Sequence, residues 1–401
     1  MTSSFMRTAL VLGLLTAIGP FAIDMYLPAL PAIGQSLHAD TGEVQWSLMA
    51  FFLSLGLCQL IYGPWSDMVG RKTPLYVGLV LFAVTSVACG LAQDIHTLTV
   101  WRFIQGIGAC ATMAIPRAIV RDLHTGADAA RLMSLLMLVF SVSPVLAPLA
   151  GSIAIELASW RAVFWAVTVA AVLGLVLTAT MLPETRPAAD RIGSNLASAW
   201  AGYVTLMKDR HFLGLTFIGG FGMASFFVYL ANSSFVLIQG YGLTPTVYSF
   251  FFSINAVAFI GTAQLTGWLT KRFGLQGVVK VAAMGYVLPL IALVVVFAMG
   301  VQRLDVLAIL LFIGYGFLGL IIPTTSVLAL DNHGEIAGTA SALLGTLQMV
   351  TAAVVVALMG LFMDGSALAM VSGIAACALI TWALTFMTLR SQGRTEPERS
   401  T

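Results

Sequence analysis

The residues of this sequence that could do chemistry are three charges placed inside long apolar runs. Asp24 lies in the first run, and Arg102 and Arg117 lie in the fourth. A charge held at membrane depth costs at least about 2.5–3.5 kcal/mol on insertion scales, so it needs a partner or a purpose. A buried acid that gains and loses a proton could carry that proton across part of a membrane, and an arginine at the same depth could hold its charge.

A second polar group interrupts the apolar pattern at residues 63–72, which read GPWSDMVGRK. Asp67 is expected at a helix C-terminus, where the helix dipole disfavours an anion, so it needs an external partner. A cation of the fourth run or the N-terminal amides of another helix could serve. Gly63 and Gly70 flank the polar residues of this segment. Gly63 would let another helix come close. In the alternative interpretation the segment is only a turn whose positive residues mark the cytoplasmic side.

The composition is that of a protein with many membrane spans. Of its 401 residues 59% are hydrophobic and only 9% are charged, whereas soluble domains carry about 25% charged residues. The four cysteines lie inside apolar runs, which favours packing over a disulfide framework or a metal site. No basic patch is dense enough for nucleic acid. We therefore expect an integral membrane protein with no bound metal and no nucleic-acid partner.

Twelve apolar runs are long enough to cross the bilayer as helices, since about 20 apolar residues span its hydrocarbon core. Helices satisfy their own backbone in lipid, and the period-2 alternation of a β-barrel is absent. The sequence thus predicts an all-α integral membrane protein with transmembrane helices near residues 8–30, 44–65, 73–92, 97–121, 129–156, 160–182, 212–237, 245–269, 275–299, 303–329, 335–361 and 367–389.

The positive residues set the orientation of these helices. With the N-terminus inside, fifteen of the 19 Lys and Arg residues lie on the cytoplasmic side, and only Arg161 and Arg303 lie on the opposite side. The remaining two are Arg102 and Arg117, inside the fourth span. Both termini are therefore expected in the cytoplasm.

The two halves of the chain repeat with an offset of 204 residues, which makes the span starts coincide. The pattern G-x3-D-x2-G of residues 63–70 then falls on G-x3-K-x2-G of residues 267–274. We expect an N-terminal six-helix bundle (1–182), a cytoplasmic linker (183–211), a C-terminal six-helix bundle (212–390) and a cytoplasmic tail (391–401). Such repeats place a substrate site near the membrane midplane between the bundles.

The linker carries an apolar pattern of its own. Leu196, Trp200, Tyr203 and Met207 recur at helical spacing. This spacing predicts a short interfacial helix, with a plain flexible loop as the alternative.

Several motifs resemble those of the major facilitator superfamily. GPWSDMVGRK (63–72) resembles the signature between its second and third helices, and RFIQGIGA (102–109) resembles its fourth-helix motif. SVSPVLAPLAG (141–151) resembles the fifth-helix antiporter motif, with Ser141, Ala147 and Ala150 where glycines are usual. DMYLPALP (24–31), RAIVRD (117–122) and AGTASAL (337–343) look like the bicyclomycin- and chloramphenicol-resistance subfamily of drug–proton antiporters.

This resemblance implies roles for the charges. Asp24 would take up a proton from the periplasm, and Arg102 would hold its charge. Both are expected at a similar depth, about six and five residues from the outer ends of their helices, so a fixed ion pair is the alternative. Arg71 would pair with Asp122 at the inner end of the fourth helix.

The resemblance also implies a cytoplasmic latch that stabilises the outward-open state. The resemblance places Asp67 against the N-terminus of the eleventh helix. The residues predicted to gate the transporter through this latch, called the gating set, are Gly63, Asp67, Gly70, Arg71, Arg117 and Asp122. Arg117 follows Pro116, which can kink the helix, and an interface anchor is the alternative role for this arginine.

The candidate substrate-binding residues offer aromatic faces and neutral hydrogen-bonding groups. They are Tyr26, Gln105, Phe226, Tyr229, Asn232, Asn255 and Gln348. Each of them taken singly is more typical of packing. One buried acid without an acidic pair indicates neutral or weakly charged amphiphiles as substrates.

Together these features predict a monomeric, proton-coupled multidrug efflux antiporter of the bacterial inner membrane. It would use no cofactor, since the proton gradient supplies the energy and no GxxxxGK[ST] motif occurs. A proton-coupled exporter of an amino acid or nucleoside is the first alternative. A non-transporting membrane sensor is the second, and it would be expected to carry a soluble signalling domain. An enzyme is not expected, because the spans hold no clustered His, Cys or acid.

Overall fold

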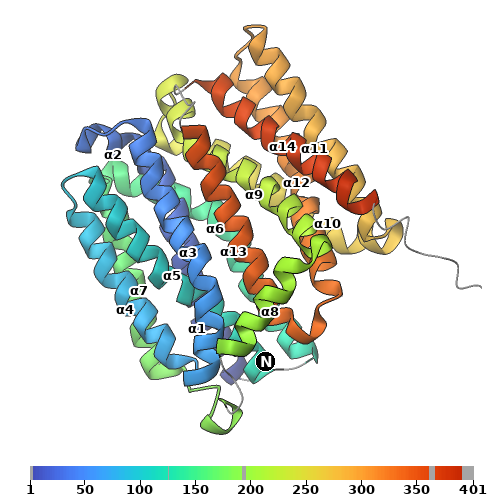
Figure 1. Ribbon diagram of the computed structural model, residues 1–401. Coiled ribbons are helices and arrows are strands. Elements are labelled where there is room, and N and C mark those ends of the chain that lie inside the picture. The colour runs from blue at the N-terminus through green and yellow to red at the C-terminus, as the bar shows by residue number, and fades with distance from the viewer. Residues whose placement is uncertain (1–2, 125, 192–195, 361–365, 391–401) are drawn as a thin grey trace, which may run out of the picture. The chain divides into compact units, whose positions relative to one another are not determined.

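The computed structural model describes residues 3–124, 126–191, 196–360 and 366–390 (Figure 1). Within these residues every regular element is helical, and twelve helical segments are long and apolar enough to cross a membrane. The predicted all-α class with twelve transmembrane helices is confirmed, with most span ends within a few residues of those expected. The predicted tail, residues 391–401, lies outside the described residues.

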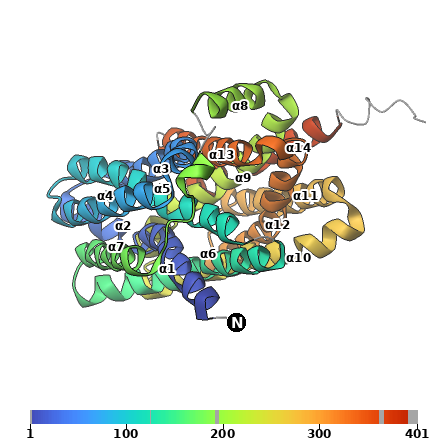
Figure 2. The ribbon, with the colours of Figure 1, turned by 90° about the horizontal axis from the view of Figure 1, so that it is seen from below.

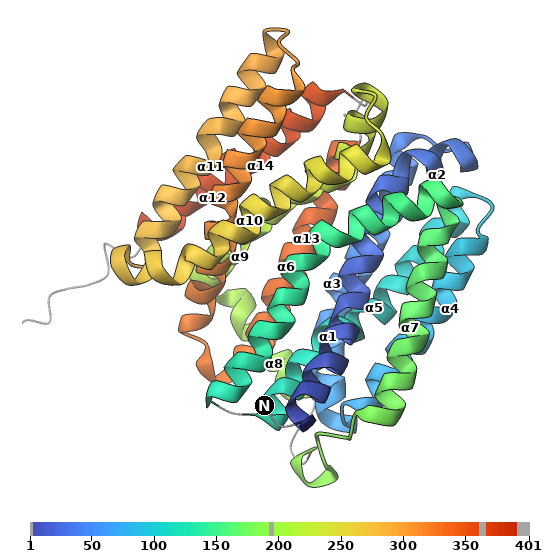
Figure 3. The same ribbon diagram turned by 180° about the vertical axis from the view of Figure 1, so that it is seen from behind.

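The helices form two compact units. Unit 1 contains Met1–Ala201 and Leu237–Ser253, and unit 2 contains Gly202–Val236 and Ile254–Thr401. The spanning elements of unit 1 are α1 (Ser3–Asp24), η1 (Leu27–Ala29), α2 (Leu30–Leu37), α3 (Thr41–Val69), α4 (Lys72–Leu91), α5 (Ile95–Leu123), α6 (Gly126–Leu157) and α7 (Arg161–Met181). In this unit α3 and α4 pack on α5, α1 packs on α6, and α7 packs on α4, as Figure 3 shows.

The first span is interrupted, which the sequence analysis did not predict. The α-helix ends at Asp24, and a short 3-10 segment with Pro28 leads into α2, which carries Pro31 in its first turn. Proline has no backbone N–H to donate, so the closely spaced prolines favour new helix starts over one continuous helix. Asp24 is therefore the last residue of a helix, and not a residue six positions inside one.

Glycines let the backbones of α3, α4 and α5 approach one another. A Cβ at Gly106 would collide with the Phe51 carbonyl oxygen and the Ser54 hydroxyl of α3. A Cβ at Gly108 would lie 2.6 Å from the Gly78 carbonyl oxygen of α4. This close packing fixes the part of α5 that carries Arg102.

Unit 2 repeats the helix pairing of unit 1. Its elements are α9 (Arg210–Ser234), η3 (Phe235–Gly240, a π-helix whose end lies in unit 1), α10 (Pro245–Phe273, whose start up to Ser253 lies in unit 1), α11 (Leu275–Ala298), α12 (Leu304–Asp331), η4 (Gly334–Ile336), α13 (Ala337–Gly360) and α14 (Ala367–Arg390). Here α9 packs against α12, α13 and α14, and α11 packs against α12 and α14, as the end-on view of Figure 2 shows. These pairs correspond to those of α1 with α5, α6 and α7, and of α4 with α5 and α7.

The backbone of the repeated loop is also alike in the two halves. Gly70 ends α3 with φ +98°, and Gly274 precedes α11 with φ +72°. Positive φ is readily adopted only by glycine, which explains why both patterns keep this residue. The offset of 204 residues is therefore present in the chain's conformation as well as in its sequence.

The linker forms η2 (Ala188–Arg191) and α8 (Leu196–Lys208), so its apolar spacing does produce a helix. Tyr203 and Leu206 are buried, whereas Trp200, Val204 and Met207 are exposed at helical spacing. The helix therefore has one buried face and one exposed apolar face, and its position at the membrane interface stays a prediction.

We expect Gly106→Ala to lower the midpoint temperature of unfolding, because overpacking a close backbone contact costs about 1–3 kcal/mol. Gly13→Ala is the matched control: its Cβ would meet only a Val139 methyl, at an ordinary 3.7 Å. Differential scanning fluorimetry of the purified protein in detergent measures both. Equal midpoints for the two variants would contradict the close approach of α3 and α5.

Candidate functional site

Arg102 lies at the centre of unit 1 as a fully buried cation without a carboxylate partner. Its exposed fraction is 0%, and among the described residues no acid oxygen lies within the 4.0 Å of an ion pair. Its Nη1 donates to Gln105 Oε1 at 2.7 Å and to the Ala22 carbonyl at 3.5 Å. Its Nε and Nη2 have no hydrogen-bond partner in the described chain.

Two aromatic rings lie against this cation. The guanidinium carbon is 4.3 Å from the ring centroid of Tyr26 and 4.3 Å from that of Phe51. A cation this close to a ring face is stabilised by about 2 kcal/mol or more when it is desolvated. Phe51 was not among the sequence candidates, because a phenylalanine in a hydrophobic helix carries no signal that separates it from a packing residue.

Asp24 is a buried acid that is not ion-paired with Arg102. It is 7% exposed, and it accepts a hydrogen bond from Ser143 of α6 at 3.4 Å. The ion pair with Arg102 that the sequence left open as an alternative is absent. A Cβ at Gly151 would collide with the backbone of Met25, so α6 packs closely against the end of α1 at this site.

Two predicted substrate-binding residues, Gln105 and Tyr26, lie around Arg102. Gln105 is fully buried, accepts from Arg102 and donates to Ser86 Oγ at 2.7 Å. Tyr26 is fully buried, and its hydroxyl lies 2.6 Å from Ser47 Oγ. Their polar groups are already bonded inside unit 1, and the analysis of single residues could not foresee this because the partners lie on other helices.

Arg117 has an exposed side chain, in contrast to Arg102. Its guanidinium carbon is 5.0 Å from the ring centroid of Phe140 on α6. No ion pair involves this arginine among the described residues.

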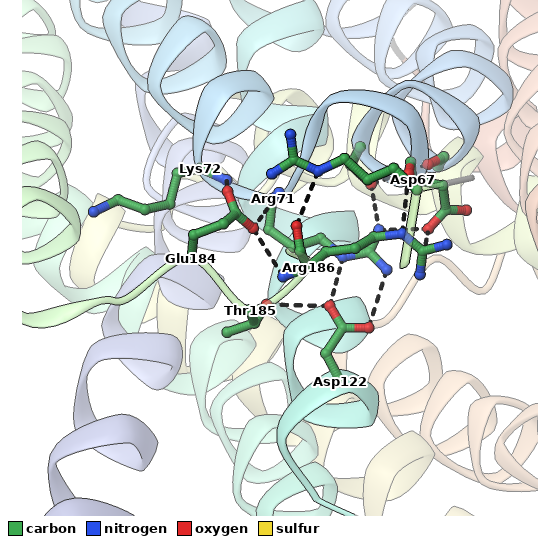
Figure 4. Close-up of polar contacts among 10 residues, drawn as sticks. Asp67, Arg71, Lys72, Asp122, Glu184, Thr185 and Arg186 are labelled. Atoms are coloured by element: carbon green, nitrogen blue, oxygen red, sulfur yellow. Dashed lines mark hydrogen bonds and ion pairs between the residues drawn. The ribbon is translucent and has the colours of Figure 1, made fainter. Parts of the chain in front are cut away.

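A dense polar cluster lies where α3, α4, α5 and the linker meet, which we call the clasp (Figure 4). Arg71 is its centre. Its Nε and Nη2 donate to the two carboxylate oxygens of Asp122 at 2.7 and 3.1 Å, as predicted from the sequence. Its Nη1 donates to Ser66 Oγ and lies 2.7 Å from Asp67 Oδ1. The guanidinium thus joins the end of α5 to the α3–α4 turn.

The linker completes the clasp through residues that the sequence analysis did not single out. Glu184 accepts from the backbone N–H groups of Arg71 and Lys72 at 2.8 and 3.1 Å, at the start of α4. Arg186 donates to the Asp67 carbonyl at 2.9 Å, and Thr185 donates to Asp122. A Pro-Glu-Thr-Arg run directly after a span was the available signal, since acids favour helix N-termini.

Within unit 1 the partners of Asp67 are Arg71, four residues on, and Arg186 of the linker. The sequence analysis did not foresee Arg186, and the expected contact of Asp67 with the eleventh helix stays a prediction. No atom of unit 1 lies within 4 Å of a Cβ built at Gly63. At Gly70 a Cβ would meet Arg191 and Glu184 within 2.7 Å, and the tight fit lies there instead.

Hydrogen bonding controls the charge of Glu184. Partial burial raises the pKa of this carboxyl, but the backbone N–H groups of Arg71, Arg186 and Lys72, together with the charge of Arg191, outweigh burial and hold the pKa below its usual range. The carboxylate therefore stays ionised at neutral and mildly acidic pH.

In unit 2 three predicted substrate-binding residues lie close together. Tyr229 Oη accepts from Asn255 Nδ2 at 3.0 Å. The Phe226 ring stacks on Phe259 and meets Tyr315 edge-on, at centroid distances of 5.8 and 5.7 Å. The sequence analysis named neither Phe259 nor Tyr315. The result is an aromatic cluster with neutral polar groups.

The other two predicted residues of unit 2 lie apart from this cluster. Asn232 donates to the Val228 carbonyl of its own helix. Gln348 lies against Gly219, which precedes Tyr229 by ten residues, or about 15 Å along α9. Among the described residues no group of three His, Cys, Asp or Glu side chains could hold a metal ion.

A family model of the Major Facilitator Superfamily matches residues 12–356. The chain belongs to this superfamily. Its members are transporters rather than enzymes, and this transporter is a multi-pass membrane protein. The suspected resemblance is confirmed, together with its bicyclomycin-resistance branch, by the relatives described next.

Two relatives of this transporter and one solved structure illustrate the match. It is 36% identical over 360 residues to an uncharacterized MFS-type transporter, YdgK, of Bacillus subtilis (strain 168), covering 88% of each chain. It is 29% identical over 399 residues to a bicyclomycin resistance protein homolog of Haemophilus influenzae, covering 96% of this chain and 97% of that one. A crystal structure of a D-xylose–proton symporter covers 95% of this chain and 98% of its own, with a TM-score of 0.75 and 16% identity, and shows the fold alone.

We expect Arg71→Lys to destabilise this transporter by roughly 1–3 kcal/mol, because an ammonium cannot reproduce the two-pronged bond to Asp122. Arg303→Lys is the control: it changes an exposed arginine that pairs with Asp305 and should leave stability nearly unchanged. Denaturant or thermal unfolding in detergent measures the difference. Equal losses at both positions would contradict the clasp.

The depressed pKa of Glu184 gives a pH dependence with a definite sign. Because the folded pKa lies below the unfolded value of about 4.3, the carboxylate stabilises the fold above that pH and stops doing so as pH falls through the folded pKa. The stability difference between wild type and Glu184→Gln should be constant from pH 5 to 8 and shrink below about pH 4. A difference that vanishes between pH 6 and 7 would contradict this assignment.

Proposed function

We propose that this transporter is a proton-coupled multidrug efflux antiporter that exports small neutral or weakly charged amphiphiles, such as amphenicol- or bicyclomycin-like compounds. It acts as a monomer in the bacterial inner membrane with both termini in the cytoplasm. The proton gradient supplies the energy, and no cofactor takes part. The bicyclomycin resistance homolog among its relatives supports a drug as substrate.

The observation that carries the proposal is the condition of Asp24. This carboxyl is buried in a membrane span, bonded to Ser143 and not ion-paired with the nearby Arg102. A carboxyl without a counter-ion in an apolar setting can accept and release a proton, whereas one fixed to an arginine stays ionised. Asp24 is therefore the proton carrier, and Arg102 supports it by responding to its charge.

The clasp is the gating element in this proposal. It fixes the α3–α4 turn to α5 and to the linker through several charged bonds, and a multi-group lock of this kind can bias an equilibrium between two conformations. Gly70, Asp67, Arg71 and Asp122 belong to it directly. Gly63 and Arg117 are kept in the proposed gating set on the basis of the sequence alone, since neither is part of the clasp.

The aromatic cluster of unit 2 is the proposed substrate surface. Phe226, Tyr229 and Asn255 supply ring faces and neutral hydrogen-bonding groups. Binding sites for small apolar molecules are typically lined in this way. Without a carboxylate of its own, the cluster favours neutral or weakly charged compounds over permanent dications.

Proteoliposomes with an imposed pH gradient test the proposal. Chloramphenicol or bicyclomycin should drive proton movement, measured with an internal pH-sensitive dye, and should accumulate against its gradient. Asp24→Asn should abolish coupled proton movement, at least about tenfold, because an amide carries no proton, while downhill substrate movement continues.

Asp305→Asn is the control, since it removes an exposed carboxylate at a helix start and should leave coupling intact. Accumulation by Asp24→Asn at the wild-type level would refute the role of Asp24. Tight, electrogenic transport of a permanent dication would refute the substrate class.

A further inference from the structure

The aromatic rings of Tyr26 and Phe51 lie beside Arg102. They have no role in the proton-carrier mechanism proposed above. Phe51 comes from α3 and Tyr26 from the turn that follows α1, so separate elements bring them to α5. Both rings are fully buried, as is the arginine. A guanidinium this deep must be stabilised locally, since no water solvates it.

The other contacts of Arg102 do not supply a negative charge. They are the neutral oxygen of Gln105 and a carbonyl oxygen at 3.5 Å, while Nε and Nη2 have no partner in the described chain. Asp24 is two residues along the chain from both Ala22, which supplies that carbonyl, and Tyr26. It is bonded to Ser143 instead. The ring faces are thus the main compensation for a full positive charge.

We propose that the ring pair Tyr26 and Phe51 holds the Arg102 cation so that Asp24 is free to be protonated. The proposal rests on the proposed role of Asp24 as proton carrier. Without the rings, the uncompensated Arg102 cation would favour the ionised form of Asp24, which lies two residues along the chain from both Tyr26 and Ala22, the residues that Arg102 contacts. The rings therefore set the pH at which Asp24 exchanges its proton.

Hydrogen bonds hold the rings and the cation in place. The Tyr26 hydroxyl is bonded to Ser47 at 2.6 Å, and Gln105 is fixed between Arg102 and Ser86. Phe51 lies where α3 approaches Gly106 most closely. The titratable groups next to the arginine on these elements are Tyr26, whose ring it contacts, and Cys89, whose Sγ lies 4.0 Å from Gln105 Oε1. Asp24 is bonded to Ser143 of α6.

Infrared titration of the reconstituted protein tests the proposal without a drug. The carbonyl stretch of protonated Asp24 is identified as the band that Asp24→Asn removes, and its midpoint is followed against pH. In Phe51→Leu and Tyr26→Leu the midpoint should fall by about one pH unit, or about 1.4 kcal/mol, because Arg102 then stabilises the carboxylate. Phe51→Tyr and Tyr26→Phe keep the ring and should restore the wild-type midpoint.

Phe82→Leu is the matched control, since Phe82 is a fully buried ring of unit 1 that is not in contact with Arg102. A wild-type midpoint in Phe51→Leu, or an equal shift in Phe82→Leu, would overturn the role of the rings. If wild type has no titrating Asp24 band, the proton-carrier role fails and the proposal fails with it. If the midpoint shifts but neither drug moves protons, the ring pair stands and the proposed substrate class fails.

Discussion

A charge inside a membrane span must be compensated within a few ångströms, because hydrocarbon offers no water to solvate it. In this transporter the constraint is most severe at Arg102, which is fully buried and has no carboxylate partner. Several elements of unit 1 supply groups that compensate this charge. The break after α1 brings Tyr26 to the guanidinium, the approach of α3 to Gly106 brings Phe51, and α4 supplies Ser86 to orient Gln105.

The clasp meets the same requirement by different means. Arg71 is almost as enclosed, but two carboxylates and a hydroxyl surround it. Charges paired in this way favour one arrangement of their helices, whereas Arg102 is held by two aromatic rings and a neutral amide oxygen. Unit 1 thus contains two enclosed arginines, one with carboxylate partners and one without any among the described residues.

The sequence predicted the helices well and the contacts unevenly. Span ends followed from hydropathy and length, because a helix must cover the hydrocarbon thickness whatever its neighbours are. The pairing of Arg71 with Asp122 was also foreseen. The break at Asp24 was missed because apolar residues continue on both sides of it. The pairing of Asp67 with Arg186 was missed because Arg186 lies in the part of the linker before its helical pattern begins at Leu196.

Composition and local pattern were enough to predict the membrane class, the twelve spans, the internal repeat and the few residues able to carry charge in the membrane. These features depend on residues that lie close together along the chain. The structure was needed to show the positive φ of Gly70 and Gly274 and the bond of Asp24 to Ser143. It was also needed to show the contacts of Arg102 with Gln105 and Tyr26, and the place of Glu184 and Arg186 in the clasp. The physical reason is that each of these contacts depends on which side chains other helices bring within hydrogen-bonding distance, and the linear pattern does not record that.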